Sequence, residues 1–115
     1  MDQHAVIVVD TSGVITEWNH AAGTLFGYGA DEAVGQSLDL VVAEPWREAH
    51  WAGFHRAMKG SRSKAFSVDL PVRCADHKVR NVAGRLVILS DGMGVAVGAM
   101  AIFSSAGSPG VRPCA

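Results

Sequence analysis

Two patterns of apolar residues divide the chain. A short β-branched run at residues 5–9 and a second strand pattern at residues 14–18 flank a turn sequence at residues 10–13, which predicts a hairpin. From Lys64 onward the apolar spacing has a period of two, which is typical of strands. This period predicts three further strands, at residues 65–72, 79–89 and 95–103. Strands are therefore expected near both ends of the chain.

Between the strands, apolar residues recur at helical spacing. A short helix is predicted between Asn19 and Gly27. Asparagine is a favourable N-cap residue, and glycine often ends a helix because it readily adopts the left-handed backbone conformation found after the last turn. Asp31 and Ser37 are predicted N-caps of two further short helices, which end near Val42.

A longer helix is predicted from Pro45 to about Lys59, and its one polar residue on an apolar face is His50. At 100° per residue, that face also carries Trp46, Gly53, Phe54 and Ala57. The charged residues outside this sector are Arg47, Glu48, Arg56 and Lys59. Trp51 also lies off this face and is expected in the core or an interface. An imidazole directed into an apolar interior is either a satisfied core histidine or a ligand for something bound there.

The order of predicted elements is two strands, several short helices, one longer helix and three strands. This order predicts an α+β domain with an antiparallel sheet and helices on one face. Such a layout leaves a pocket between the sheet and the long helix, where His50 points. The domain is expected to cover residues 1–104, with residues 105–115 as a flexible tail of low apolar content.

Composition limits the classes of partner. The chain has 115 residues, of which 49% are hydrophobic, and a formal net charge of -1, so nothing favours a nucleic acid as partner. No apolar run is long enough to cross a bilayer, and the first residues do not form a signal peptide. We therefore expect a cytoplasmic protein without a membrane partner.

Neither the cysteines nor the polar residues of the sequence point to a catalytic function. Cys74 and Cys114 are expected to be free thiols in a protein without a secretion signal, with a disulfide between them as the alternative. The chain has no Ser-His-Asp, paired-carboxylate or Cys-His arrangement that would support catalysis, so it is not expected to be an enzyme.

Three stretches of the first 38 residues share the pattern of a known family. They are IVVDTSGVITEWNHAA at residues 7–22, LFGY at residues 25–28 and EAVGQSL at residues 32–38. With the order of elements, these stretches resemble a PAS domain over about residues 5–103. The resemblance implies a five-stranded antiparallel sheet that cradles a ligand or cofactor, used for sensing and for protein–protein signalling.

Two branches of that family are poor matches. The flavin-binding photosensors need a cysteine at the position where this chain has Leu38. The photoactive-yellow-protein branch needs a reactive cysteine near its chromophore, whereas Cys74 lies in a predicted hairpin turn. Thiol photochemistry is therefore not expected.

The haem-binding oxygen sensors of the FixL and Dos types are closer to this chain. In those families a histidine on the long helix, three residues after an arginine, is the proximal iron ligand, and Arg47 and His50 have this spacing. Neutral imidazole is a natural ligand for iron. The resemblance therefore implies a b-type haem whose iron is bound by His50, in a domain that senses a diatomic gas such as oxygen or a redox state.

The same resemblance predicts the surroundings of the haem. Gly53 would leave room for a flat macrocycle. Val68 stands where those sensors carry a distal arginine, and Phe66 where the Dos type supplies a methionine, so an apolar distal side would favour carbon monoxide or nitric oxide over oxygen. Met100 is a candidate sixth ligand, although strand methionines more often fill the core. The full set of predicted cofactor-binding residues is Val42, Trp46, His50, Gly53, Phe54, Phe66, Val68, Gly84, Leu86 and Met100.

A second reading stays open from the sequence alone. The domain could lack a cofactor and act by protein–protein contact, or take an apolar small ligand in the same pocket. In either case a separate signalling protein or effector domain is the expected partner. The outer face of the sheet is the surface expected for a homodimer.

Overall fold

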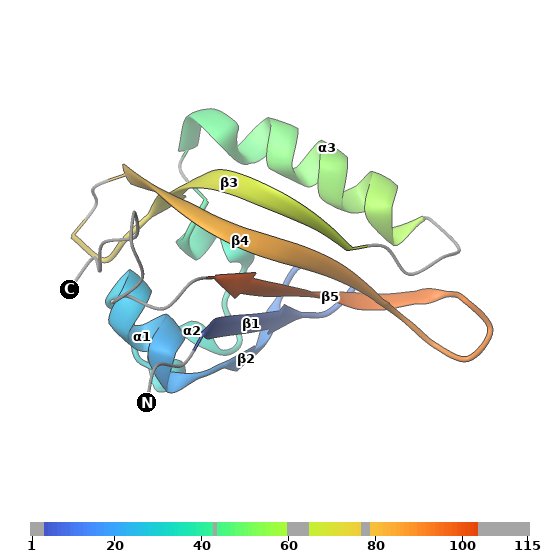
Figure 1. The fold of residues 1–115 in the computed structure, drawn as a ribbon, viewed down its shortest axis with the longest axis horizontal. Helices are drawn as coiled ribbons and strands as arrows, with labels where there is room; N and C mark the ends of the chain where they lie inside the picture. Colours follow the sequence, from blue (N-terminus) through green and yellow to red (C-terminus); the bar gives the residue numbers. More distant parts are fainter. Residues whose placement is uncertain (1–3, 43, 60–64, 77–78, 104–115) are drawn as a thin grey trace.

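The computed structural model describes residues 4–42, 44–59, 65–76 and 79–103, and for residues 65–71, 73 and 79–83 it describes the backbone alone. Five strands form one sheet in the order β2-β1-β5-β4-β3, and every neighbouring pair is antiparallel (Figure 1). The elements are β1 (Ala5–Val9), β2 (Ile15–Trp18), α1 (His20–Phe26), α2 (Ala30–Ala33), the 3-10 turns η1 (Leu38–Leu40) and η2 (Glu44–Trp46), α3 (Arg47–Met58), β3 (Ala65–Arg73), β4 (Val79–Ser90) and β5 (Ala96–Phe103). The predicted α+β class with a five-stranded antiparallel sheet is confirmed.

The turn between β1 and β2 is built by one aspartate and one glycine. The carboxylate of Asp10 accepts hydrogen bonds from the backbone N–H of Ser12 at 2.9 Å and of Val14 at 3.0 Å. Gly13 has a φ of +80°, a backbone conformation that residues with a side chain rarely adopt. The predicted hairpin is therefore confirmed. Its second strand begins at Ile15 and not at Val14, because Val14 forms an isolated bridge with Ser37.

Two of the three predicted caps are confirmed. The side chain of Asn19 accepts from the N–H of Ala22 at 2.9 Å at the start of α1, and Ser37 accepts from the N–H of Asp39 at 3.2 Å at the start of η1. The cap predicted at Asp31 is wrong, because the N-cap of α2 is Gly29, two residues earlier, and the helix begins at Ala30. The carboxylate of Glu32 accepts from the N–H of Gly29 at 2.9 Å and satisfies that helix end instead.

The long helix α3 begins two residues after Pro45, which lies in the 3-10 turn η2. A proline has the φ value of both helix types, so its position predicted the helical region but not its first regular turn. Phe54 is the only buried residue of α3. The other residues of this helix are therefore at least partly exposed to solvent.

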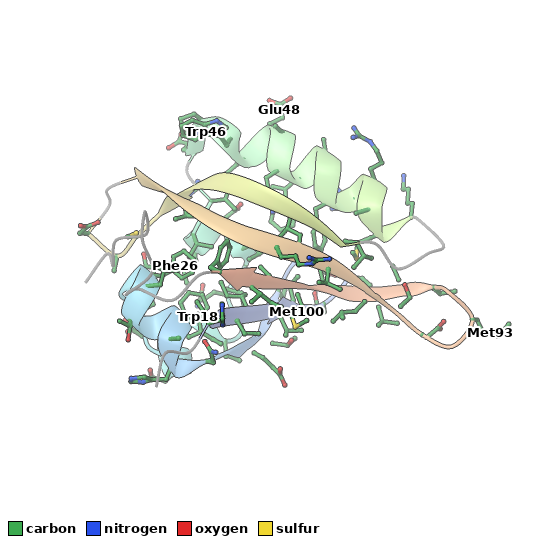
Figure 2. The ribbon with its side chains drawn as sticks, in the orientation of Figure 1. Trp18, Phe26, Trp46, Glu48, Met93 and Met100 are labelled. Atoms are coloured by element: carbon green, nitrogen blue, oxygen red, sulfur yellow. The ribbon has the colours of Figure 1, made fainter. Side chains whose placement is uncertain are left out.

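Aromatic side chains join α1 to the sheet. The rings of Trp18 and Phe26 have centroids 5.5 Å apart, and Phe26 meets Phe103 of β5 edge-on at 5.6 Å (Figure 2). These contacts hold the end of the domain where β1 and β5 lie together.

The cysteine prediction is corrected at one position. Cys74 is fully buried and bonded in a disulfide, so it is not a free thiol. Cys114 and the predicted tail at residues 105–115 lie outside the described residues. Within the described part of the chain, no helix has both the length and the apolar character needed to span a membrane.

Candidate functional site

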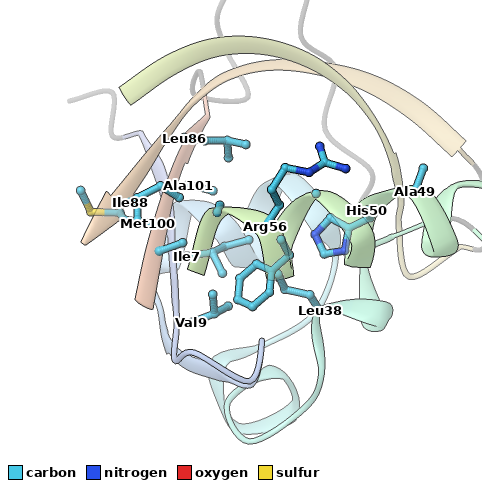
Figure 3. A pocket seen from close by; sticks show the side chains of 14 residues that line it. Ile7, Val9, Leu38, Ala49, His50, Arg56, Leu86, Ile88, Met100 and Ala101 are labelled. Atoms are coloured by element: carbon cyan, nitrogen blue, oxygen red, sulfur yellow. The ribbon is translucent and has the colours of Figure 1, made fainter. Parts of the chain in front are cut away.

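A cavity of about 390 Å³ lies between α3 and the sheet (Figure 3). Its described lining comes from β1, β4, β5, η1 and α3 and consists of Ile7, Val9, Leu38, Ala49, His50, Gly53, Phe54, Arg56, Ala57, Leu86, Ile88, Ala99, Met100 and Ala101. A second cavity of about 320 Å³ adjoins it towards η2 and shares six of these residues, including Leu38 and His50. Volumes of this size and apolar linings with few polar groups are typical of small-ligand sites.

His50 is the polar side chain that both cavities share. Its Nδ1 atom is buried and has no hydrogen-bond partner. The ring stacks on Phe54 with centroids 6.1 Å apart and meets Trp51 edge-on at 4.8 Å. A buried polar atom without a partner costs about 1–3 kcal/mol, which a bound group that contacts His50 would recover.

Burial also determines the ionisation of this histidine. The pKa of His50 lies below its usual value because burial disfavours the charged imidazolium. The carboxylate of Asp39 opposes this shift, and His55 adds to it. The neutral imidazole, which is the form that binds metals and accepts hydrogen bonds, is therefore favoured in the folded protein.

We expect the ligand-free protein to lose stability as the pH falls below about 6.5, the unfolded-state pKa of histidine. Above that value His50 is neutral in both states and contributes no pH dependence. Below it the unfolded chain binds the proton more readily than the folded one, so acid favours unfolding. Urea unfolding at several pH values should show a shallower loss of stability in His50→Gln than in wild type. The same change at exposed His20 is the control, and equal slopes in wild type and His50→Gln would contradict the prediction.

Gly53 and Arg56 complete the α3 side of the larger cavity. A Cβ atom built on Gly53 meets no atom within 4 Å, so the glycine leaves open space beside the cavity. Arg56 is exposed, as expected for a residue outside the apolar face, and its long side chain nevertheless reaches the lining of the larger cavity. Among the described lining residues it is the only cation.

The structure brings together most of the predicted residues. His50 and Leu86 line both cavities, and five other predicted residues line one cavity each. Val42 and Trp46 line the smaller cavity, and Gly53, Phe54 and Met100 line the larger one. The sulfur of Met100 points away from His50, which does not favour a role as a second ligand on the same iron (Figure 3).

The expectation for Gly84 is corrected by its neighbour on β5. Gly84 pairs with Phe103 across the sheet and does not belong to the described lining of either cavity. A Cβ atom on Gly84 would lie 2.5 Å from the Phe103 ring. The space left by the glycine is therefore filled by Phe103 and is not open to a cofactor.

Phe66 and Val68 lie on β3, opposite Leu86 and Gly84 of β4. Their side chains lie outside the described residues, so the expected apolar distal side stays a prediction at these two positions.

Several lining residues were not predicted from the sequence. They come mainly from the inward-facing positions of the strands and from η1, and they are Ile7, Val9, Leu38, Ala49, Ile88, Ala99 and Ala101. The alternating burial of β1 was a usable signal, since Ile7 and Val9 are buried and Val6 and Val8 are not. The opposite side of the sheet carries Val6 and Val8, and the homodimer expected there stays a prediction.

A metal-binding site made of several side chains is not present among the described residues. No group of three or more histidine, cysteine, aspartate or glutamate side chains is placed there to hold a metal ion. A single histidine in an apolar cavity is instead the arrangement expected for a cofactor that carries its own equatorial ligands.

The order of elements, the cavity under α3 and its histidine agree with one family. A profile of the PAS fold matches residues 3–104. The chain belongs to the PAS family. PAS domains are in general sensory or signalling modules that bind small ligands and contact other proteins. This chain is therefore a sensory or signalling module of that general kind.

Two curated relatives match part of this PAS domain. The sensor protein FixL of Bradyrhizobium diazoefficiens is 41% identical over 46 residues, which are 40% of this chain and 9% of FixL. An uncharacterized protein of Azorhizobium caulinodans is 36% identical over 53 residues, which are 45% of this chain and 7% of that protein. The matches therefore span less than a tenth of either relative, and the first is consistent with a FixL-like relationship.

Solved PAS structures share the fold at low sequence identity. A PAS domain from Colwellia psychrerythraea has a TM-score of 0.76 and 22% identity, with 89% of this chain and 85% of that chain covered. The RpfR quorum-sensing receptor PAS domain of Cronobacter turicensis, solved with C12:0, has a TM-score of 0.73 and 12% identity, with 91% and 95% covered. The PAS-B domain of Drosophila melanogaster Cycle, solved with ethylene glycol, has a TM-score of 0.71 and 13% identity, with 88% and 98% covered.

Proposed function

We propose that this PAS domain is a sensor that binds b-type haem in the cavity under α3, with His50 as the iron ligand. The observation that carries the proposal is the buried, unpartnered Nδ1 of a histidine that both cavities share. The Arg47 and His50 spacing, which resembles the proximal motif of the FixL and Dos sensors, supports it, as does the FixL relative.

The residues present fit the cofactor in three respects. The lowered pKa of His50 favours the neutral imidazole that iron requires. Gly53 leaves open space beside the lining, and Phe54 and Leu86 offer apolar surface to a macrocycle. Arg56 offers a guanidinium for a carboxylate of the ligand.

Bound haem would supply an iron centre that takes up diatomic gases or changes its redox state. The chain's contribution is to hold the cofactor by one imidazole and to exclude water with apolar side chains. Phe66 and Val68, the residue types expected on the distal side, have no hydrogen-bond donor in their side chains. Oxygen gains from such a donor more than carbon monoxide or nitric oxide does, so we propose carbon monoxide and nitric oxide as the preferred signals.

The test is an absorption spectrum of the purified protein, oxidised, reduced and with carbon monoxide, after addition of hemin. Wild type is expected to show a Soret band that shifts with carbon monoxide, and His50→Ala is expected to lose the band or bind hemin at least about a hundredfold more weakly. His20→Ala, a change at an exposed histidine of α1, is the matched control. Wild type without a Soret band after addition of hemin would reject the haem proposal.

A second candidate is favoured by one specific observation. The larger cavity is apolar except for His50 and a single cation, Arg56, which is the lining expected for an apolar chain with one acidic group. The RpfR PAS domain solved with C12:0 has the same fold. Binding of dodecanoic acid, weakened by Arg56→Gln and without any Soret band on addition of hemin, would favour this candidate over haem.

A further inference from the structure

Three side chains tie the first half of α3 to the segment that precedes it. We call Asp39, Arg47 and Trp51 the α3 anchor. The indole Nε1 of Trp51 donates to the carboxylate of Asp39 at 2.7 Å. The guanidinium of Arg47 donates to the backbone carbonyl of Asp39 at 3.2 Å and to that of Val42 at 3.1 Å. All three hydrogen bonds are accepted by Asp39 or Val42. This short segment therefore holds the first half of α3 in place by polar contacts.

The anchor is also fixed from its apolar side. The six-membered ring of Trp51 lies on Gly13, where a Cβ atom would be 2.2 Å from the indole Cη2. The indole also meets the rings of His50 and Phe54 edge-on, at 4.8 Å and 5.4 Å, and it stacks on the ring of His55 at 5.9 Å. Trp51 is therefore held between a carboxylate, a glycine turn and the imidazole of the candidate site.

The anchor residues stand next to lining residues on both elements. Asp39 follows Leu38, and Trp51 follows His50, and both Leu38 and His50 line the two cavities. A shift of the indole would therefore change the place of His50 relative to Leu38. The carboxylate of Asp39 opposes this shift, because it accepts the one indole hydrogen bond, and the packing of the indole on Gly13 opposes it as well.

We propose that Asp39 is a positioning residue for His50: by holding Trp51, it keeps the imidazole directed at the cavity and thereby sets the affinity for the ligand. The part of this inference that concerns affinity rests on the proposed function. The part that concerns the placement of the imidazole is a property of the ligand-free protein and is tested without any ligand.

The test compares three variants with wild type in the ligand-free protein, by the NMR signals of the His50 ring protons at a pH where the imidazole is neutral. Asp39→Ala removes the acceptor and is expected to move these signals, because the ring-current shift from Trp51 is lost. Asp39→Asn keeps an oxygen that accepts from the indole and is expected to retain the wild-type shifts. Asp31→Asn, at an exposed carboxylate of α2, is the control. His50 signals that are the same in Asp39→Ala and in wild type would overturn the proposal.

A variant on the other side of the hydrogen bond guards against misfolding of Asp39→Ala. Trp51→Phe keeps an aromatic ring and removes the donor, and it is expected to alter the His50 signals while distant signals from α1 stay unchanged. His50 signals unchanged in Trp51→Phe would overturn the proposal in the same way.

Hemin titrations of the same proteins test the affinity. Asp39→Ala and Trp51→Phe are each expected to bind hemin about tenfold more weakly. The double variant is expected to bind hemin no more weakly than Asp39→Ala, because that change alone already removes both the indole hydrogen bond and the 3.8 Å ion pair between Arg47 and Asp39. If wild type binds hemin and the single variants bind it equally well, the positioning role fails and the proposed function stands. If wild type binds no hemin, the proposed function fails, and the NMR comparison alone decides the role of Asp39.

Discussion

Replacement of Gly53 by tryptophan is expected to abolish binding in the larger cavity. The glycine is exposed and lies in the lining, and a Cβ atom added there meets no atom within 4 Å, so we expect an indole at this position to be accommodated without displacing the core and to obstruct the cavity. We expect affinity for hemin, or for dodecanoic acid in the second candidate, to fall at least about a hundredfold, since the ligand and the indole would compete for one volume. Absorbance titration for hemin and calorimetry for the fatty acid measure the loss.

The matched control at this position is Gly53→Ala. A methyl group fills little of the cavity, and alanine in a helix interior is favoured over glycine by about 0.5–1 kcal/mol. The alanine variant should therefore bind nearly as well as wild type and unfold at a higher urea concentration. Wild-type affinity in Gly53→Trp would show that the ligand lies elsewhere.

Replacement of Gly13 by alanine is expected to destabilise the fold by about 2–4 kcal/mol. Two effects add at this position. The residue has a φ of +80°, and its Cβ would lie 2.2 Å and 2.3 Å from two carbons of the Trp51 ring. Urea unfolding followed by circular dichroism measures the change.

Gly35 separates the two effects. It has a φ of +93°, and a Cβ there meets nothing within 4 Å, so Gly35→Ala carries the backbone strain alone. We expect Gly35→Ala to cost about 1 kcal/mol, and Gly13→Ala to cost clearly more. Removal of the indole by Trp51→Ala should reduce the added cost of Gly13→Ala, and equal costs in both backgrounds would contradict the contact.

The fold was predictable because its signals are local. The cap at Asn19, the turn at Gly13 and the period of two after residue 64 each depend on a few neighbouring residues, and the structure confirms the elements they predict. Family resemblance then supplied the five-stranded antiparallel sheet, whereas the order of the strands in space was not predicted, because no local pattern contains it.

The site was predictable on the helix and less so on the sheet. Helical spacing alone placed Gly53 and Phe54 with His50, and all three line the larger cavity. Arg56 was not predicted in the lining because a helical projection gives the direction of a side chain and not its reach. Gly84 was misplaced because its space is filled by Phe103, which belongs to another strand.

The packing of Trp51 against Gly13 also has an evolutionary consequence. The constraint acts in one direction: a side chain at the turn requires a smaller residue on the helix, whereas a smaller residue on the helix is compatible with the glycine. Among relatives of this chain we therefore expect the two positions to covary, with tryptophan on α3 restricted to proteins that keep glycine in the first turn. A survey of such sequences would then separate domains that have this contact from those that attach α3 in another way.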